Sequence, residues 1–327
     1  MEIQVTGEQT YLSPLAILPT QQVEPNVVAA VARPFVKWVG GKTQLLSHID
    51  SNLPAQLKAG RLAYFEPFLG GGSVFFHVAH RYPLERFIIS DNNSDLILAY
   101  RTVQKHVNSL IDILSEIQSR FWSLSIAKRS ELYYATRDAF NASRDDRSED
   151  SAFKIERTAQ LIFLNKTCFN GLYRVNAKGG FNVAFGRYDR PPICDPSNLL
   201  ACSSVLQRAN ILLCDFGDVL DAVRGESFVY LDPPYRPISA TSNFTSYSPS
   251  TFSGADQERL AEYCIELDKQ GSLLMISNSD PKNIDPTDQY FEQTYPRFRI
   301  TTLSANRMVN CKADRRGKIS ELLITNY

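Results

Sequence analysis

The stretch Asp232-Pro233-Pro234-Tyr235 follows the apolar run Ser227-Phe228-Val229-Tyr230-Leu231, which predicts a short buried strand. Proline lacks an N–H and fixes φ, so the chain is expected to leave the sheet just after Asp232 with its carbonyl groups unpaired. A carboxylate oxygen and a proline carbonyl can both accept hydrogen bonds from one amino group, and the Tyr235 ring offers a flat face to a planar base. The combination suggests a site for an exocyclic amine, although such residues taken alone more often form only a stiff turn.

A second junction between a predicted strand and a predicted helix lies at Leu62 to Phe76, where Gly70-Gly71-Gly72 separates the two elements. The first turn of a doubly wound sheet uses such glycines to bring the backbone close to a nucleotide-type cofactor. The dinucleotide pattern G-x-G-x-x-G is incomplete because Phe75 stands at its third glycine, so NAD binding is only weakly indicated. The next predicted strand ends at Asp91, which could bind two ribose hydroxyls or cap the helix that follows.

The segment Gly40-Gly41-Lys42-Thr43 precedes another predicted helix. Its end resembles a phosphate-binding P-loop, but that pattern requires a glycine where Val36 stands, so the P-loop is excluded. The glycine pair still permits close approach of the backbone to a ligand, and Lys42 at the helix start could meet a carboxylate. An exposed lysine at an ordinary helix start is the alternative.

The remaining chain predicts an α/β protein with an inserted helical part. A chain of 327 residues with 43% hydrophobic content can bury one large core. Apolar residues between Leu96 and Phe121 recur on one face of a long helix, residues 151–165 predict another helix, and the polar residues 137–150 predict a loop. Further strands are expected at 209–216, 272–278, 298–303 and 321–327, which gives a sheet of about seven strands.

Between the helical part and the next strand, residues 169–188 interleave glycines, asparagines, arginines and aromatic rings, and Lys178-Gly179-Gly180 is typical of a hairpin tip. Arginine can bind guanine through two hydrogen bonds, asparagine can bind adenine or a phosphate, and an aromatic ring can stack on a base or enter a base step. The segment is therefore predicted to enter a DNA groove, and an ordinary exposed hairpin is the less favoured alternative.

Charge is balanced over the chain, with Lys+Arg 35 against Asp+Glu 35, so binding of a polyanion would depend on local basic surfaces. Residues 151–190 and 297–318 are candidate phosphate-facing segments, and a solvated basic face is an equally good interpretation of either alone. The six cysteines and four histidines complete no metal-binding spacing, which favours reduced thiols in a cytosol and no metal. No long apolar span or basic leader predicts a membrane or secreted protein, and residues 1–33 are expected to form a flexible extension.

In this order, the motifs resemble those of the DNA adenine-N6 methyltransferases of the Dam and DpnII type, the D12 class, from about Phe35 to Tyr327. Lys37-Trp38-Val39-Gly40-Gly41-Lys42 is similar to the family's K-W-x-G-G-K element. Glu66-Pro67-Phe68-Leu69-Gly70-Gly71-Gly72 is similar to its cofactor loop, and Asp232-Pro233-Pro234-Tyr235 to its catalytic motif. Residues 170–174 and 181–188 resemble its DNA-reading hairpin. D-P-P-Y also occurs in other amino-group methyltransferases, but the ordered set is highly specific.

The resemblance implies a Rossmann-like, class I S-adenosylmethionine-dependent methyltransferase sheet formed by residues 34–95 and 206–327, with a mainly helical target-recognition subdomain at 96–205. The expected catalytic residues are Asp232, Pro233, Pro234 and Tyr235. The cofactor is expected to be S-adenosylmethionine, bound by Trp38, Gly40, Lys42, Glu66, Phe68, Gly70, Gly72, Ser73, Asp91, Asn92, Asp215, Phe216 and Asp232.

For the substrate, the resemblance implies double-stranded DNA and the site GATC. Lys37 and Arg174 match family positions that contact guanines, Phe169 matches an aromatic wedge at the target, and Leu172 matches a contact to a thymine methyl group. Many family members have proline at the position of Ala184, which also touches the base step. The expected DNA-binding residues are Lys37, Phe169, Asn170, Leu172, Arg174, Asn176, Asn182, Ala184 and Arg187.

Two alternatives stay open. One is an amino-group methyltransferase acting on RNA or on another DNA site, such as cytosine N4. The other is a catalytically inactive DNA-binding protein on the same scaffold, which would be expected to have lost Asp232, Tyr235 or the glycine turn. The resemblance further implies a monomer in a prokaryotic cytoplasm, associated with the nucleoid, and leaves open whether a cognate restriction endonuclease acts on the same site.

Overall fold

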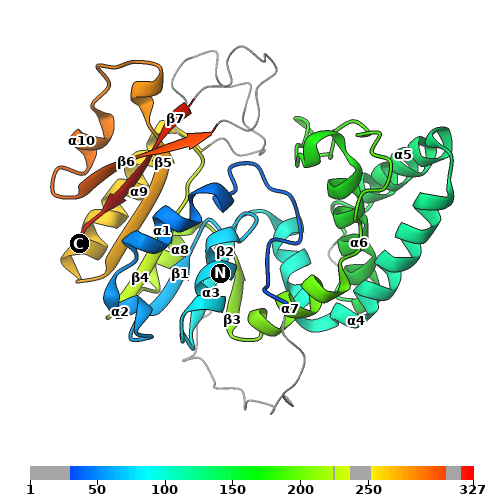
Figure 1. Ribbon diagram of the computed structural model, residues 1–327, viewed down its shortest axis with the longest axis horizontal. Helices are drawn as coiled ribbons and strands as arrows, with labels where there is room; N and C mark the ends of the chain where they lie inside the picture. The colour runs from blue at the N-terminus through cyan, green and yellow to red at the C-terminus, as the bar shows by residue number, and fades with distance from the viewer. Residues whose placement is uncertain (1–29, 147, 224, 236–251, 307–317) are drawn as a thin grey trace, which may run out of the picture.

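The computed structural model describes residues 30–146, 148–223, 225–235, 252–306 and 318–327. This part of the chain is an α/β fold built on a seven-stranded sheet with the strand order β3-β2-β1-β4-β5-β7-β6 (Figure 1). Neighbouring strands among β1 to β5 are parallel, and β7 is antiparallel to both β5 and β6. The predicted fold class and strand number are confirmed. The strands are β1 (Ala63–Glu66), β2 (Phe87–Asp91), β3 (Ala209–Leu213), β4 (Ser227–Leu231), β5 (Leu273–Ser279), β6 (Arg299–Asn306) and β7 (Lys318–Thr325).

Helices cover both faces of the sheet. The α-helices are α1 (Leu46–Asn52), α2 (Ala55–Lys58), α3 (Ser73–Arg81), α4 (Ser94–Ser123), α5 (Ile126–Ala142), α6 (Ser151–Thr167), α7 (Pro196–Leu206), α8 (Phe216–Asp221), α9 (Gly254–Lys269) and α10 (Tyr290–Thr294). Short 3-10 helices are η1 (Thr43–Leu45), η2 (Phe169–Gly171) and η4 (Pro281–Asn283). One buried core lies between the sheet and helices α1, α2, α3, α7 and the start of α4. The other lies between the sheet and helices α8, α9 and α10.

Strand β4 shows how the sequence builds these two cores. All of its residues are buried. Phe228 and Tyr230 pack into one core and Val229 and Leu231 into the other, because side chains alternate along a strand. A strand covered on both faces reads as an unbroken apolar run, as is typical of parallel sheets.

The helical part lies on the side of the sheet away from β6 and β7 (Figure 1). Helix α4 begins after Asn93, whose side chain accepts a hydrogen bond from the Leu96 N–H, and it bends at His106 (φ −135°, ψ 32°). The predicted long amphipathic helix is therefore confirmed, with a kink. A buried ion pair of 2.8 Å joins Arg157 of α6 to Asp95 of α4, and Arg157 also donates to the Phe140 carbonyl of α5. One guanidinium thus connects all three helices.

The prediction of a loop over residues 137–150 was wrong in its first part, because α5 continues to Ala142. Ser125 caps this helix by accepting a hydrogen bond from the Lys128 N–H, and Tyr133 and Phe140 bury one narrow face. Arg129 is also buried, but most of the other residues of the helix are at least partly exposed, including the apolar Ile126. The weak amphipathic pattern of this helix concealed it in the sequence.

Residues 168–188 fold back on themselves as expected for a hairpin, but within this segment the pairing is reduced to the isolated bridges Val175–Phe181 and Cys168–Phe185. The predicted tip is present. The Asn176 side chain accepts hydrogen bonds from the N–H groups of Lys178 and Gly180 and so closes the turn. The paired residues alternate with glycines and asparagines, which are poor strand formers.

Ordered contacts begin before residue 34. Ala32 is buried, and Arg33 forms a 2.6 Å ion pair with Asp195 of the loop that leads into α7. The cysteines in the described part of the chain, which excludes Cys311, are all free thiols. Within the described ranges, no helix has the length and apolar character needed to cross a membrane.

Candidate active site

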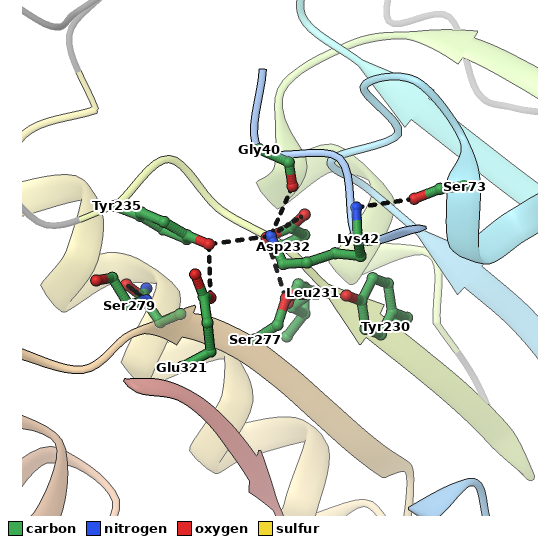
Figure 2. Close-up of polar contacts among 11 residues, drawn as sticks. Gly40, Lys42, Ser73, Tyr230, Leu231, Asp232, Tyr235, Ser277, Ser279 and Glu321 are labelled. Carbon is green, nitrogen blue, oxygen red and sulfur yellow. Dashed lines mark hydrogen bonds and ion pairs between the residues drawn. The ribbon is translucent and has the colours of Figure 1, made fainter. Parts of the chain in front are cut away.

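The carboxylate of Asp232 lies beside the buried ammonium of Lys42, although the two residues are 190 positions apart. Asp232 directly follows β4, and Lys42 directly precedes η1. The Lys42 Nζ is 2.6 Å and 2.8 Å from the two carboxylate oxygens (Figure 2). Strand order reverses between β1 and β4, and ligands of open α/β sheets bind at the carboxyl ends of strands at such a point. The catalytic motif proposed from the sequence therefore lies where this fold places a site.

Further polar side chains fix the orientation of Asp232. Ser277 of β5 donates a hydrogen bond of 3.0 Å to Oδ1 of Asp232, and the Ser277 hydroxyl is 2.9 Å from the Tyr230 hydroxyl of β4. Lys42 also donates to the carbonyl of Gly40 at 2.9 Å. These contacts hold the carboxylate in one rotamer at the end of the sheet (Figure 2).

Tyr235 is anchored through its hydroxyl, while the residue as a whole is 37% exposed. The hydroxyl accepts a hydrogen bond from Lys42 at 3.2 Å and donates one to the carboxylate of Glu321 at 2.7 Å. Burial, together with the charges of Asp232 and Glu321, raises the pKa of Tyr235, so the hydroxyl remains a donor. Burial likewise raises the pKa of Glu321.

The carbonyl groups of Pro233 and Pro234 differ in their hydrogen bonding. The Pro234 carbonyl accepts a hydrogen bond of 3.1 Å from the Gln257 side chain of α9, which fixes the loop. Among the described residues none donates a hydrogen bond to the Pro233 carbonyl, so the prediction of unpaired carbonyl groups holds for Pro233 but was wrong for Pro234. An amine bound at Asp232 could therefore find a second acceptor there.

Glu66, at the end of β1, is a buried carboxyl next to this cluster, with 2% of its surface exposed. Burial raises its pKa to about 8, the nearby Asp232 charge adds to the rise, and the hydrogen bond from the Tyr64 hydroxyl opposes it. That bond is 2.6 Å long. Burial therefore favours the protonated form of Glu66.

The glycine turn between β1 and α3 has a backbone that only glycine adopts easily. Gly70 and Gly72 have φ of 49° and 70°. A side chain at Gly70 would lie 2.9 Å from the Trp38 ring, and one at Gly72 would lie 2.5 Å from the Tyr100 hydroxyl. The Asp91 carboxylate, from the end of β2, accepts a 3.0 Å hydrogen bond from the Gly70 N–H. The structure thus brings Trp38, the glycine turn and Asp91 together.

Several other expected cofactor residues adjoin this turn. The Ser73 hydroxyl, at the start of α3, accepts a 3.2 Å hydrogen bond from the Lys42 N–H and so ties α3 to the Lys42 loop. Asn92 is exposed directly after β2. Burial raises the pKa of Asp91, and hydrogen bonds from the backbone N–H groups of Gly70, Asn93 and Asn92 oppose this rise.

An aromatic cluster borders the same edge of the sheet. Phe68 and Phe216 stack with ring centroids 5.3 Å apart, and the Arg259 guanidinium lies 4.1 Å from the Phe216 ring. Asp215 caps α8 and pairs with Arg259 at 2.7 Å. Burial raises the pKa of Asp215, but the bonds from Arg259 and the Gly217 N–H together hold it below its usual value. Because Phe216 is buried, Phe68 offers the more accessible ring of the two.

The expected DNA-binding residues gather on the exposed side of segment 168–188 and beside it. Phe169 is 55% exposed. Lys37 lies across Gly171, where an added Cβ would be 2.2 Å from the lysine Cδ, and its Nζ is 5.1 Å from the Tyr188 ring. Arg174 is exposed, and its guanidinium donates hydrogen bonds of 2.8 Å and 3.1 Å to the side chain and backbone oxygens of Asn182.

The remaining members of that set are placed as follows. Asn170 and Arg187 are exposed and have positive φ of 56° and 57°, conformations that mark both ends of the segment. Asn176 uses its side-chain oxygen within the hairpin tip. Ala184 is exposed, Leu172 is half-buried, and the Ala184 carbonyl accepts a hydrogen bond from the Phe169 N–H. Their contacts with DNA remain predictions.

The sequence did not identify Ser277, Tyr230 or Glu321 as parts of the site. Ser277 and Tyr230 stand in apolar strand segments, where a hydroxyl that points toward a carboxylate reads as an ordinary core residue. Glu321 is a buried acid inside β7, and its place beside Tyr235 depends on the order of strands in the sheet, which the sequence pattern does not show. Among the described residues, no cluster of three His, Cys, Asp or Glu side chains could hold a metal ion.

Comparison with known proteins agrees with this geometry. Residues 38–309 match the family model described as D12 class N6 adenine-specific DNA methyltransferase. The chain is 50% identical over 297 residues to the Type II methyltransferase M.MjaIII of Methanocaldococcus jannaschii, covering 90% of this chain and 99% of that protein. It is 38% identical to the Type II methyltransferase M1.LlaDCHI of Lactococcus lactis subsp. cremoris over 90% and 95% of the two chains. It is 33% identical to the DNA adenine methylase of Escherichia coli K12 over 89% and 94%.

Proposed function

The chain belongs to the D12 class N6 adenine-specific DNA methyltransferases, and from this premise we propose that it methylates the adenine of GATC in duplex DNA, with S-adenosylmethionine as methyl donor. The observation that carries the proposal is the meeting of the Asp232 carboxylate, Lys42 and the glycine turn at one edge of the sheet. That edge lies beside an exposed segment rich in groups that bind bases.

The residues present suit this cofactor. Gly70 and Gly72 let a ligand approach the backbone, since no Cβ stands in the way. Asp91 could accept hydrogen bonds from a ribose, Phe68 could stack on an adenine ring, and Lys42 would border the cofactor while its ammonium stays on Asp232. The other residues proposed to line the cofactor site are Trp38, Gly40, Glu66, Ser73, Asn92, Asp215 and Phe216. When bound, S-adenosylmethionine supplies a methyl group on a positively charged sulfur.

Asp232 and Pro233 would hold the target amine. A base inside a duplex cannot reach this buried edge, so the target adenine must leave the stack, at a cost of a few kcal/mol. Its N6 amine then donates one hydrogen bond to Asp232 and one to the Pro233 carbonyl. These bonds draw the nitrogen lone pair out of conjugation with the ring, which makes the nitrogen a nucleophile. Tyr235 stacks on the base and holds it in line for transfer.

The choice of GATC is supported by the residues that resemble the family's readers. Lys37 and Arg174 would bind the guanines, Leu172 would touch a thymine methyl group, and Phe169 would fill the space left by the target adenine. Asn182 holds the Arg174 guanidinium in one orientation, which suits recognition through two hydrogen bonds. The other residues proposed to contact DNA are Asn170, Asn176, Asn182, Ala184 and Arg187.

The proposal is tested with unmethylated plasmid DNA. After incubation with the protein and S-adenosylmethionine, the plasmid is treated with one nuclease that GATC adenine methylation blocks and with another that requires this methylation. We expect the first to fail and the second to cut. If neither nuclease changes its behaviour while methyl label enters the DNA, the GATC assignment is wrong. If no label enters DNA, the assignment as a DNA methyltransferase is wrong for this chain.

The names of two relatives, both called Type II methyltransferases, also support a cognate restriction endonuclease that acts on the same site. A gene for such an endonuclease beside the gene for this chain is the expected finding. We expect the protein to act as a monomer, which sedimentation in the presence and absence of a duplex would test.

A further inference from the structure

We propose that Glu321 is a positioning residue that holds the Tyr235 ring in the orientation needed to stack on the target adenine. The inference rests on the proposed function, since it assigns a role within that active site. Glu321 belongs to β7, the last strand in sequence, far along the chain from the residues that the family motifs identify.

The position of Glu321 is fixed by the sheet. Its backbone pairs with Ser279 of β5 on one side and with Leu303 of β6 on the other. Its side chain is 7% exposed and reaches toward the end of β4, where Oε2 accepts the 2.7 Å hydrogen bond from Tyr235 (Figure 2). A carboxylate held on a paired strand is a more rigid anchor than one on a loop.

Tyr235 needs such an anchor. The two prolines before it fix the backbone but leave the tyrosine side chain free to rotate, and the residue is 37% exposed. The hydroxyl has two partners among the described residues. Lys42 donates a hydrogen bond to it, whereas Glu321 accepts a hydrogen bond from it. Lys42 also donates hydrogen bonds to both oxygens of Asp232 and to the Gly40 carbonyl. Its hydrogen bond to Tyr235 is the longest of these four. Glu321 is therefore the principal restraint on the ring.

The alternative role is electrostatic, because the Glu321 carboxyl lies near the charges of Lys42 and Asp232. The two roles make different demands on the side chain. Holding the ring requires only an acceptor oxygen, which glutamine also provides. Tuning the charge of Lys42 requires the carboxylate itself. The substitutions Glu321→Gln and Glu321→Leu separate them, because only leucine removes the acceptor.

The test measures the single-turnover rate of methyl transfer to a duplex that contains the target site. We expect Glu321→Leu to lower this rate by about tenfold or more, because small misplacements of a reacting group are costly. Glu321→Gln should recover most of that loss. The dissociation constants for duplex DNA and for S-adenosylmethionine should stay within about twofold of the wild-type values, since Glu321 acts through Tyr235 alone.

A double-mutant cycle with Tyr235→Phe provides the second measurement, because it removes the same hydrogen bond without altering β7. If the account is right, Tyr235→Phe and Glu321→Leu each lower the rate, and combining them lowers it no further. With 2-aminopurine at the target position, Glu321→Leu should also give brighter fluorescence in the complex, because the flipped base stacks less firmly.

Three results would overturn the inference. The first is a Glu321→Gln variant as slow as Glu321→Leu, which would point to the charge. The second is a double variant whose loss equals the product of the single losses. The third is a Tyr235→Phe variant with the wild-type rate, which applies even if Glu321→Leu fails to fold. Failure of the proposed function is recognised separately, because the wild-type protein would then transfer no methyl group to DNA.

Discussion

The chemistry of this site depends on a few residues whose side chains are buried or held in place. Lys42 is 3% exposed, and its ammonium is compensated by Asp232 and by neutral acceptors. Asp232 itself keeps 21% of its side chain exposed, so under the proposed function a substrate amine would meet a carboxylate that the protein has already oriented. Holding the reacting groups in position in this way supplies much of the acceleration of a transfer reaction.

Glu66 gives the site a pH-dependent contribution to stability. Its pKa of about 8 in the folded protein lies above the ordinary value of 4.5. Between these values the unfolded chain loses the proton and the folded chain retains it, so ionisation favours unfolding as the pH rises. Relative to Glu66→Gln, the wild-type free energy of unfolding should fall from pH 5 to pH 8 by up to about 1.4 kcal/mol per pH unit. Urea denaturation at several pH values measures this, and parallel pH profiles for the two proteins would refute it.

Arg174 is expected to read one guanine. Arg174→Ala should weaken discrimination at one base pair of the site by ~1–3 kcal/mol, because the paired hydrogen bonds to guanine are lost. Competition among duplexes that differ at single positions measures this loss. Lys178→Ala, at the exposed hairpin tip, is the matched control and should leave the order of preference unchanged. If Arg174→Ala weakens all duplexes equally, Arg174 contacts a phosphate and not a base.

At the scale of elements, the helical part depends on one buried ion pair. Arg157 of α6 binds Asp95 of α4 and the Phe140 carbonyl of α5. Arg157→Leu leaves Asp95 without its cation and should lower the free energy of unfolding by about 3 kcal/mol. Arg120→Leu, on the exposed face of α4, serves as the control and should change it little. Equal urea midpoints for the two variants would show that the ion pair is not a principal connection.

The elements also show which features a sequence can predict. The parallel strands were predictable because a strand buried on both faces appears as a continuous apolar run, as at Ser227–Leu231. Helix α4 was predictable because its apolar stripe is long. Helix α5 was not predicted, and its last residues were assigned to a loop, because few of its residues are buried. The hairpin was predicted from its tip, but the shortness of its pairing follows from contacts with distant segments such as the Asn141 side chain, which binds Phe181.

At the scale of the whole molecule, the site combines residues from distant parts of the chain. The sequence indicated Lys42, the glycine turn, Asp91 and Asp232, since each stands at the end of a strand or the start of a helix. Parallel topology brings such ends to one edge. It did not indicate Glu321, because β7 enters antiparallel between β5 and β6 and meets the site from the opposite direction. That contact depends on the order of strands in the sheet, which no local pattern encodes.

The central claim is that Asp232 supports methyl transfer to adenine N6 in DNA. The most direct test incubates the wild-type protein and Asp232→Ala with methyl-labelled S-adenosylmethionine and a GATC duplex, followed by mass spectrometry of the nucleosides. Glu262→Ala, an exposed acid of α9, is the matched control. The account predicts labelled N6-methyladenine for the wild type and Glu262→Ala, and none for Asp232→Ala, which still binds the duplex. Label introduced by Asp232→Ala, or label found on cytosine, would contradict it.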